Sequence, residues 1–194
     1  MNRLRLRRES GQSMVEFAIA LPMVTLLALG LIELSSALLD QHVVTRLTRE
    51  GSNLTSRDTT LQDAVTALRG MSSRPVNFDD GSSVLILSVI KNVATVGAAN
   101  YNKPILYQRV QYGTLARSSQ LSTRGSGSFG GAPDYQAANS DNDANLQITN
   151  LPAGIVTLGG MLYVTEIYST HASLTPLNNF GITVPPQLYS IAYF

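Results

Sequence analysis

The chain has 194 residues and contains neither cysteine nor tryptophan. The absence of cysteine excludes disulfide bridges, thiolate metal sites and cysteine nucleophiles. Charged residues are also scarce, at 14% of the chain, whereas hydrophobic residues make up 44%. This apolar material is sufficient for a membrane segment and one modest globular domain. A domain outside the cytoplasm would have to be held by its own core or by neighbouring subunits, because no disulfide can form.

Positive charge is concentrated at the start of the chain. The net charge is +1, yet the residues after position 10 comprise 10 basic and 12 acidic side chains. Because the basic excess lies only in a short leader, the sequence does not favour nucleic-acid binding. An arginine-rich start before an apolar run predicts a cytoplasmic N-terminus and a chain that crosses outward. The arginines are Arg3, Arg5, Arg7 and Arg8.

A long apolar segment follows the leader. Residues 17–32 are almost all apolar, and apolar residues continue past Glu33 to Leu39. At ~1.5 Å per residue this length is enough to cross a bilayer core of ~30 Å. We therefore predict a basic leader over residues 1–11 and a transmembrane helix over residues 12–39. Pro22 lacks a backbone donor and is expected to kink this helix.

Two alternatives remain for the same segment. A cleaved signal peptide has an apolar region of about 7–15 residues and a small-residue cleavage site. The present run is longer, and Ser35-Ser36-Ala37 is only a weak candidate for such a site. The other alternative is a single-span membrane anchor for a periplasmic or cell-surface binding domain, with the leader retained.

Two carboxylates border the apolar run, Glu16 and Glu33. They are separated by about 25 Å along a helix, so each is predicted to lie near one face of the bilayer. Glu33 is predicted to be a residue of the outer interface. Glu16 has no nearby cation once the arginines are removed, but a cut after Gly11 would create an ammonium group on Gln12, one turn away. That ammonium, or the one of a neighbouring subunit, could pair with Glu16 and set the axial register of packed helices.

These residues resemble a known family. Gly11 followed by Glu16-Phe17 is similar to the processing site of type IV prepilins. More specifically, the chain resembles the TadE-like pseudopilins of the tight-adherence (Tad/Flp, type IVb) pilus systems. The family's Arg-Glu-Gly-Ala-Arg stretch is kept only in part, as Arg49-Glu50-Gly51-Ser52-Asn53, and Leu34 replaces the usual Phe. Thr175-Pro176-Leu177 is a looser match to a C-terminal Pro-Leu. The stronger matching runs are Gly11-Gln12-Ser13-Met14-Val15-Glu16-Phe17-Ala18, Leu21-Pro22 and Gly30-Leu31-Ile32-Glu33.

The resemblance implies a minor pilin that is not an enzyme and needs no cofactor or metal. It implies that prepilin peptidase cuts between Gly11 and Gln12, and that Glu16 and Phe17 serve recognition and assembly. The implied partners are prepilin peptidase, the major Flp pilin, other pseudopilins, the assembly platform and membrane lipid. The implied location is the bacterial inner membrane, with the C-terminal domain outside, and then the pilus or cell surface. The implied role is to join or prime a pilus used in adhesion, surface attachment or biofilm formation.

The remaining pattern predicts an α+β, pilin-like fold. Residues 40–57 read as an amphipathic extension of the first helix, and a short second helix is expected between Thr60 and Gly70. The long helix is expected to pack on a small antiparallel sheet within a domain over residues 58–194 outside the cytoplasm. One face of the first strand would then be covered by the helix and the other by neighbouring subunits. The strands are expected at residues 84–90, 105–112, 161–168 and 187–194.

A polar insertion and a few chemistry-bearing residues complete the sequence. Residues 116–150 are rich in Ser, Gly, Asn and Asp, which predicts a flexible loop that is either disordered or a functional surface loop. Asp141-Asn142-Asp143 resembles the start of a calcium loop, but the required glycine and final glutamate are missing. His42 and His171 are expected to be surface residues. No catalytic set is indicated.

Overall fold

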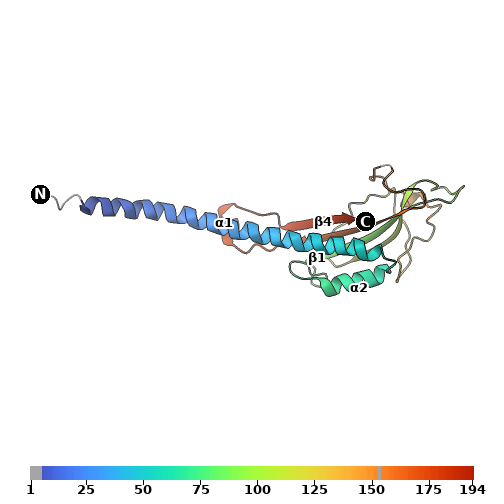
Figure 1. Ribbon diagram of the computed structural model, residues 1–194, viewed down its shortest axis with the longest axis horizontal. Coiled ribbons are helices and arrows are strands. Elements are labelled where there is room, and N and C mark those ends of the chain that lie inside the picture. The colour runs from blue at the N-terminus through green and yellow to red at the C-terminus, as the bar shows by residue number, and fades with distance from the viewer. Residues whose placement is uncertain (1–5, 153) are drawn as a thin grey trace. The chain divides into compact units, whose positions relative to one another are not determined.

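The structure is a computed structural model that describes residues 6–152 and 154–194. The predicted role of Arg3 and Arg5 falls outside the described residues. The chain divides into two units, one formed by the chain up to Leu39 with Ala172–Pro186, the other by Asp40–His171 with Gln187–Phe194. Helix α1 (Leu6–Thr55) contributes to both units (Figure 1).

The second unit contains a four-stranded antiparallel sheet in the order β2-β1-β3-β4. All four predicted strands form, with ends that differ from the prediction by at most two residues. Together with the long N-terminal helix, this sheet confirms the predicted α+β class. The strands are β1 (Ser83–Asn92), β2 (Pro104–Tyr112), β3 (Met161–Thr170) and β4 (Gln187–Tyr193).

Two helices cover one face of the sheet. Leu85, Leu87 and Val89 alternate along β1 and enter a core with Val44 and Leu47 of α1. This alternation follows from the two-residue period of a strand, which directs every second side chain to the same face. Helix α2 (Leu61–Met71) lies beside the end of α1 (Figure 1) and adds four buried residues to the core.

The start of α2 follows the predicted capping pattern. The Thr60 hydroxyl accepts a hydrogen bond from the Asp63 backbone amide at 3.1 Å. This bond satisfies one of the amides that the first turn of a helix leaves without a partner. The helix runs one residue past Gly70 and ends at Met71.

Gly51 allows α1 to approach β3 closely. A Cβ atom at this position would lie 2.7 Å from Cγ2 and 2.8 Å from Oγ1 of the buried Thr165. We expect Gly51→Leu to lower the stability of the domain by about 1–3 kcal/mol, because overpacking forces backbone or rotamer shifts. Thermal unfolding of the full chain in detergent micelles measures this. Gly70→Leu is the matched control, since nothing lies within 4 Å of a Cβ there, and an equal effect of both substitutions would contradict the account.

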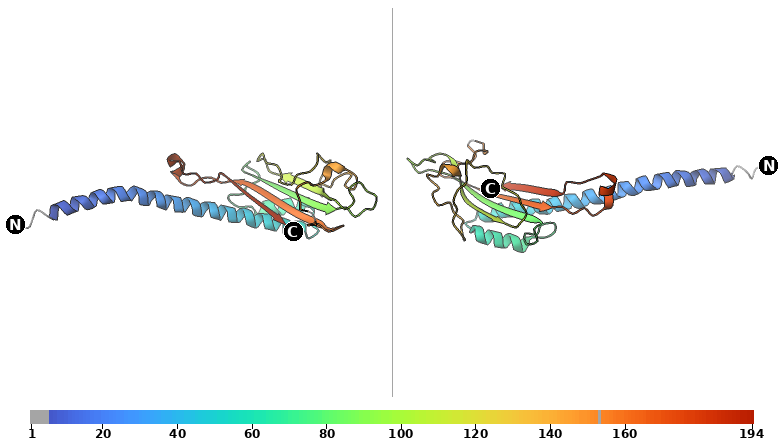
Figure 2. Two further views of the ribbon diagram at one scale, coloured as in Figure 1. Left: turned by 90° about the horizontal axis from the view of Figure 1, so that it is seen from above. Right: turned by 180° about the vertical axis from the view of Figure 1, so that it is seen from behind.

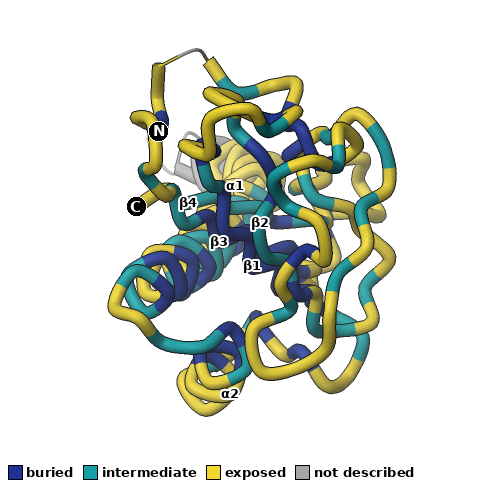
Figure 3. Tube along the Cα trace, turned by 90° about the vertical axis from the view of Figure 1, so that its right-hand side faces the viewer, coloured by how far each residue is buried: buried dark blue, intermediate teal, exposed yellow. Residues whose placement is uncertain are grey.

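The opposite face of the sheet is covered by the chain itself. β1 is buried almost throughout (Figure 3), and its Ile90 packs with Leu121, Ile148 and Val156 from the segment between β2 and β3. The prediction that neighbouring subunits cover this face is therefore wrong. The polar segment 116–150, predicted to be flexible, makes isolated bridges to β2 at Ile105 and Gln108 and holds the short η1 helix (Ala144–Leu146).

One of the two histidines is not a surface residue as predicted. His42 is exposed, but His171 is buried just after β3, where its Nδ1 lies 2.7 Å from Oδ2 of Asp40. The contact joins two residues that are 131 positions apart in the sequence. A carboxylate partner explains why an imidazole can be buried at this position.

Candidate processing and assembly site

Gly11 lies inside α1, five residues after the helix begins. An added Cβ atom at Gly11 would meet nothing within 4 Å, so no contact in the described chain requires a glycine there. Glycine is about 1 kcal/mol less favourable than alanine inside a helix, and the ends of helices fray. The peptide bond between Gly11 and Gln12 therefore lies where the helix is easy to unwind.

Gln12 and Glu16 contact each other on the surface of the helix. Nε2 of Gln12 donates a hydrogen bond to Oε1 of Glu16 at 3.0 Å. The four-residue spacing places the two side chains on the same face. The structure thus brings together the residue that would become the new N-terminus and the carboxylate predicted to pair with it.

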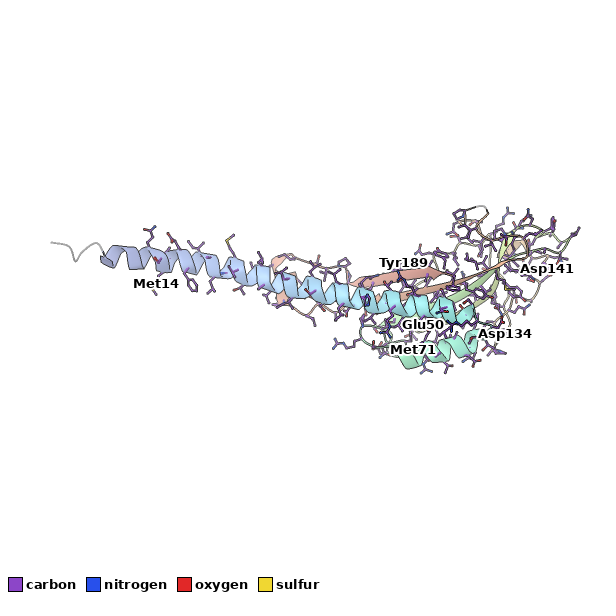
Figure 4. All side chains as sticks on the ribbon, in the orientation of Figure 1. Met14, Glu50, Met71, Asp134, Asp141 and Tyr189 are labelled. Carbon is purple, nitrogen blue, oxygen red and sulfur yellow. The ribbon has the colours of Figure 1, made fainter. Side chains whose placement is uncertain are left out.

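The helix around Glu16 is largely uncovered. Residues 11–25 are all exposed, and Phe17 has 66% of its surface accessible. Figure 4 shows the Met14 side chain projecting outward from this part of α1. The described chain contains one helix that is long and apolar enough to cross a membrane, at Gly11–Thr55, and its most apolar stretch is not buried by the rest of the protein.

Pro22 lies within α1, and the helix continues through it. Figure 2 shows that the ribbon of α1 curves along its N-terminal half. The Thr25 hydroxyl donates to the Leu21 carbonyl at 2.8 Å, a local bond that satisfies the hydroxyl without another helix. A kink caused by Pro22 itself stays a prediction.

Glu33, in contrast, is only 3% exposed and is held by the connection between β3 and β4 (Ala172–Pro186), called here the β3–β4 connection. Its Oε2 atom accepts hydrogen bonds from the amides of Leu174 at 3.0 Å and Thr175 at 2.9 Å. The Thr175 hydroxyl donates to the same oxygen at 2.8 Å, and the Ser173 hydroxyl donates to the Thr175 carbonyl at 3.1 Å. Glu33 therefore fastens the β3–β4 connection to α1, next to the short η2 helix (Pro176–Phe180).

Sequence reasoning missed this partner of Glu33. The only signal was the looser Thr175-Pro176-Leu177 match, which contains one of the residues that bind the carboxylate. The two glutamates thus differ in their surroundings. Glu16 lies on bare helix, whereas Glu33 is enclosed by backbone and hydroxyl donors from a segment about 140 residues later.

A second buried carboxylate, Glu166 on β3, lies on the face of the sheet covered by the segment between β2 and β3. It accepts hydrogen bonds from the Ser119 hydroxyl, from the Gln120 amide at 2.8 Å and from the Tyr189 hydroxyl at 3.1 Å. Burial, followed by the nearby charge of Glu166, raises the pKa of Tyr189, so this phenol remains a neutral donor. Figure 4 labels Tyr189 on β4. The cluster holds the segment between β2 and β3 on the sheet.

The described residues contain no group of three or more metal-binding side chains. The oxygens of the calcium-like run are used within the protein. Asp141 accepts a hydrogen bond from the Thr95 hydroxyl at 2.7 Å, and Asp143 caps η1 by accepting from the Asn145 amide at 2.9 Å. The bond from Thr95 ties the run to the segment after β1.

The fold and the bare helix define a class of protein in which one long, membrane-compatible apolar helix carries a small α+β domain. Within that class, residues 11–53 match the family model described as TadE-like protein, so the N-terminal helix is TadE-like and the predicted resemblance is confirmed. This match supports a pilin-like role associated with the Tad pilus, and anchoring in a membrane. No curated protein and no solved structure matches the chain.

Proposed function

We propose that this chain is a minor pilin (pseudopilin) of a Tad/Flp pilus that prepilin peptidase cuts between Gly11 and Gln12. It is an assembly protein and not an enzyme. The observation that carries the proposal is the exposed, uncharged stretch of α1 after Glu16, with the Gln12–Glu16 contact at its start. A soluble domain would have to bury such a surface, because exposed apolar patches of this length mark interaction sites.

The mechanism is the packing of α1 against other helices. In the bilayer the exposed side chains after Phe17 contact lipid, and on assembly they contact the helices of neighbouring subunits. Helix association in such surroundings depends on close packing and on polar pairs more than on a hydrophobic gain. Glu16 supplies the polar group, and its partner is the ammonium of Gln12 in this subunit or in the next one.

The proposed processing follows from the position of Gly11. A peptidase must hold the scissile bond in an extended form, so the first turns of α1 have to unwind. Gly11 lowers the helix propensity at that point and presents no side chain to the enzyme. The arginines of the leader hold the N-terminus in the cytoplasm until it is removed.

The domain carried on α1 would be displayed outside the inner membrane and then on the pilus or the cell surface. The partners in this proposal are prepilin peptidase, the major Flp pilin, other pseudopilins, the assembly platform and membrane lipid. A role in starting or joining the pilus fits a subunit with a sheet domain of this size. Adhesion, surface attachment or biofilm formation would be the resulting activity.

We expect Gly11→Val to block removal of the leader. The β-branched side chain would stand directly before the scissile bond and stiffen the backbone that must unwind. Intact-mass measurement of the chain, purified from cells that contain the peptidase, should show the full length for Gly11→Val. The wild-type chain should be shorter by residues 1–11.

Gly70→Val is the control, because Gly70 also lies in a helix with nothing within 4 Å of an added Cβ. This variant should be processed like the wild type. If Gly11→Val is shortened as well, the proposed cleavage point is wrong. If the wild type keeps its leader, the alternative of an uncut single-span anchor for a binding domain is supported instead.

A further inference from the structure

The β3–β4 connection has a composition unlike that of the rest of the domain. Its 15 residues, 172–186, include no charged side chain. Three large apolar residues in it are nevertheless exposed, Leu174 at 60%, Phe180 at 62% and Ile182 at 51%. A soluble surface normally places charged and polar side chains at such positions. An uncharged segment with three large exposed apolar side chains is suited to contact with an apolar surface.

Around Glu33, one face of α1 is less exposed than the others. Leu26, Leu29 and Gly30 are partly buried, and Glu33 is fully buried, whereas Leu27, Leu31 and Ile32 are exposed. The spacing of three and four residues marks a single helix face. Within the unit of the chain up to Leu39 and Ala172–Pro186, the connection is the segment that can cover this face. The connection meets this face at Glu33, through the amides of Leu174 and Thr175.

The position of this contact relative to a bilayer follows from helix geometry. A membrane-spanning helix needs about 20 residues. Counted from Gln12, such a span ends at Leu31, two residues before Glu33. Glu33, where the connection is held, therefore lies about 3 Å beyond the end of such a span along the helix axis. The connection therefore reaches the depth at which the outer leaflet changes from acyl chains to headgroups.

The carboxylate of Glu33 can lie at this depth because its hydrogen-bond partners satisfy it. Two backbone amides and the Thr175 hydroxyl satisfy its carboxylate, so the helix carries no unpaired charge into the interface. The same bonds fix the connection at one height on α1. An uncharged segment with exposed Leu, Phe and Ile side chains, held at that height, suits the headgroup–acyl boundary.

We propose that the β3–β4 connection is a lipid-contacting element that lies in the outer interface of the bilayer and fixes how deep α1 sits. This inference depends on the membrane insertion in the proposed function. It assigns Phe180, Leu174 and Ile182 as lipid contacts and Glu33 as the residue that positions them. The surface that these side chains contact is the outer surface of the membrane, and no second copy of the chain is needed.

The absence of tryptophan allows a direct test, because any introduced tryptophan is the only one in the chain. Three single variants of the full chain would be placed in phosphatidylcholine vesicles: Leu21→Trp, Phe180→Trp and Tyr101→Trp. Each is measured with lipid brominated either near the headgroup or near the end of the acyl chain. Bromine quenches tryptophan only on close contact, so the two lipids report depth.

Leu21→Trp is expected to lose emission mainly with the deeply brominated lipid. Phe180→Trp should lose emission mainly with the shallow lipid, and Tyr101→Trp, in the other unit, should lose little with either. If Leu21→Trp is quenched but Phe180→Trp is not, the interfacial role is overturned while membrane insertion stands. If Leu21→Trp is not quenched, the proposed insertion itself fails. A blue-shifted but unquenched Phe180→Trp would indicate contact with protein and would also overturn the inference.

A second variant tests the tether. Adding Glu33→Ala to Phe180→Trp removes the acceptor of the hydrogen bonds from Leu174 and Thr175. The preference of Phe180→Trp for the shallow lipid should then decrease, because the connection is no longer held at one height. Unchanged quenching in the double variant would contradict the positioning role of Glu33.

Discussion

Glu16→Ala is expected to leave cleavage after Gly11 intact and to reduce incorporation of the chain into pili on the order of tenfold or more. The Glu16 side chain accepts a hydrogen bond from the Gln12 side chain, and the surrounding helix is exposed. Its loss should therefore not disturb the fold. In an assembled bundle the same carboxylate would face a cationic N-terminus, and removing it leaves that ammonium in apolar surroundings. An interhelical polar pair of ordinary strength accounts for an effect of this size.

The measurement compares the amount of the chain in sheared, purified pili with the amount in the membrane fraction. Glu16→Asp keeps the charge on a shorter side chain and should retain more incorporation than Glu16→Ala. Intact mass shows whether the leader has been removed from each variant. Normal incorporation of processed Glu16→Ala would refute the role of Glu16 in setting register.

Glu166→Ala is expected to cause the largest loss of stability, about 3–5 kcal/mol. The substitution removes the acceptor for the Ser119 hydroxyl, the Gln120 amide and the Tyr189 hydroxyl. It also removes the charge that favours the protonated form of the half-buried Arg109, whose pKa is lowered by desolvation. Since small domains are stable by only about 5–15 kcal/mol, this change is a large fraction of the total.

Unfolding of the full chain in micelles, followed by the tyrosine near-ultraviolet signal, tests this prediction. Asp79→Asn is the control, because Asp79 pairs with Arg69 at 2.9 Å on the surface, where ion pairs contribute little. Hydrogen exchange should become faster over residues 116–124 in Glu166→Ala. Equal stability of Glu166→Ala and Asp79→Asn would show that the buried cluster does not hold the segment between β2 and β3.

The sequence predicted the elements well because each has a strong local pattern. The run Val84–Ile90 is apolar and β-branched, and it forms the centre of β1. Thr60 and Asp63 predicted the start of α2 through a capping bond that depends on residues three positions apart. The apolar run after Phe17 predicted a long helix because its length and composition allow little else.

The sequence did not predict which partners far apart along the chain contact each other. Residues 116–150 have the composition of a flexible loop, yet Ser119 and Gln120 bind Glu166, and the Asn150 side chain binds the Gln120 carbonyl at 2.6 Å. The composition of a segment gives its average polarity. It does not show which carboxylate a particular serine will bind in the folded chain. For the same reason, the sequence did not predict that His171 contacts Asp40 or that Glu33 accepts a hydrogen bond from Thr175. A long-range contact of a single polar side chain produces no periodic pattern in the sequence from which it could be predicted.

The candidate site divides in the same way. Gly11, Gln12, Glu16 and Phe17 could be named from the sequence because they form one contiguous motif, and residues 11–53 match the TadE-like family model. The role of the β3–β4 connection could not be predicted from the sequence, since the connection contacts Glu33 only after the domain between these two segments has folded. Its contribution is a contact at Glu33, in the middle of α1, whereas the motif at residues 11–17 belongs to the processing that we propose.

N-terminal analysis of the mature protein tests the central claim most directly. The chain would be purified from cells with an active prepilin peptidase and from cells that lack it, and its first residues determined by sequencing and intact mass. The account predicts Gln12 as the first residue in the former and the uncut leader in the latter. An intact Met1 or Arg3 in cells with active peptidase, or a chain that begins beyond Ser36, would contradict it.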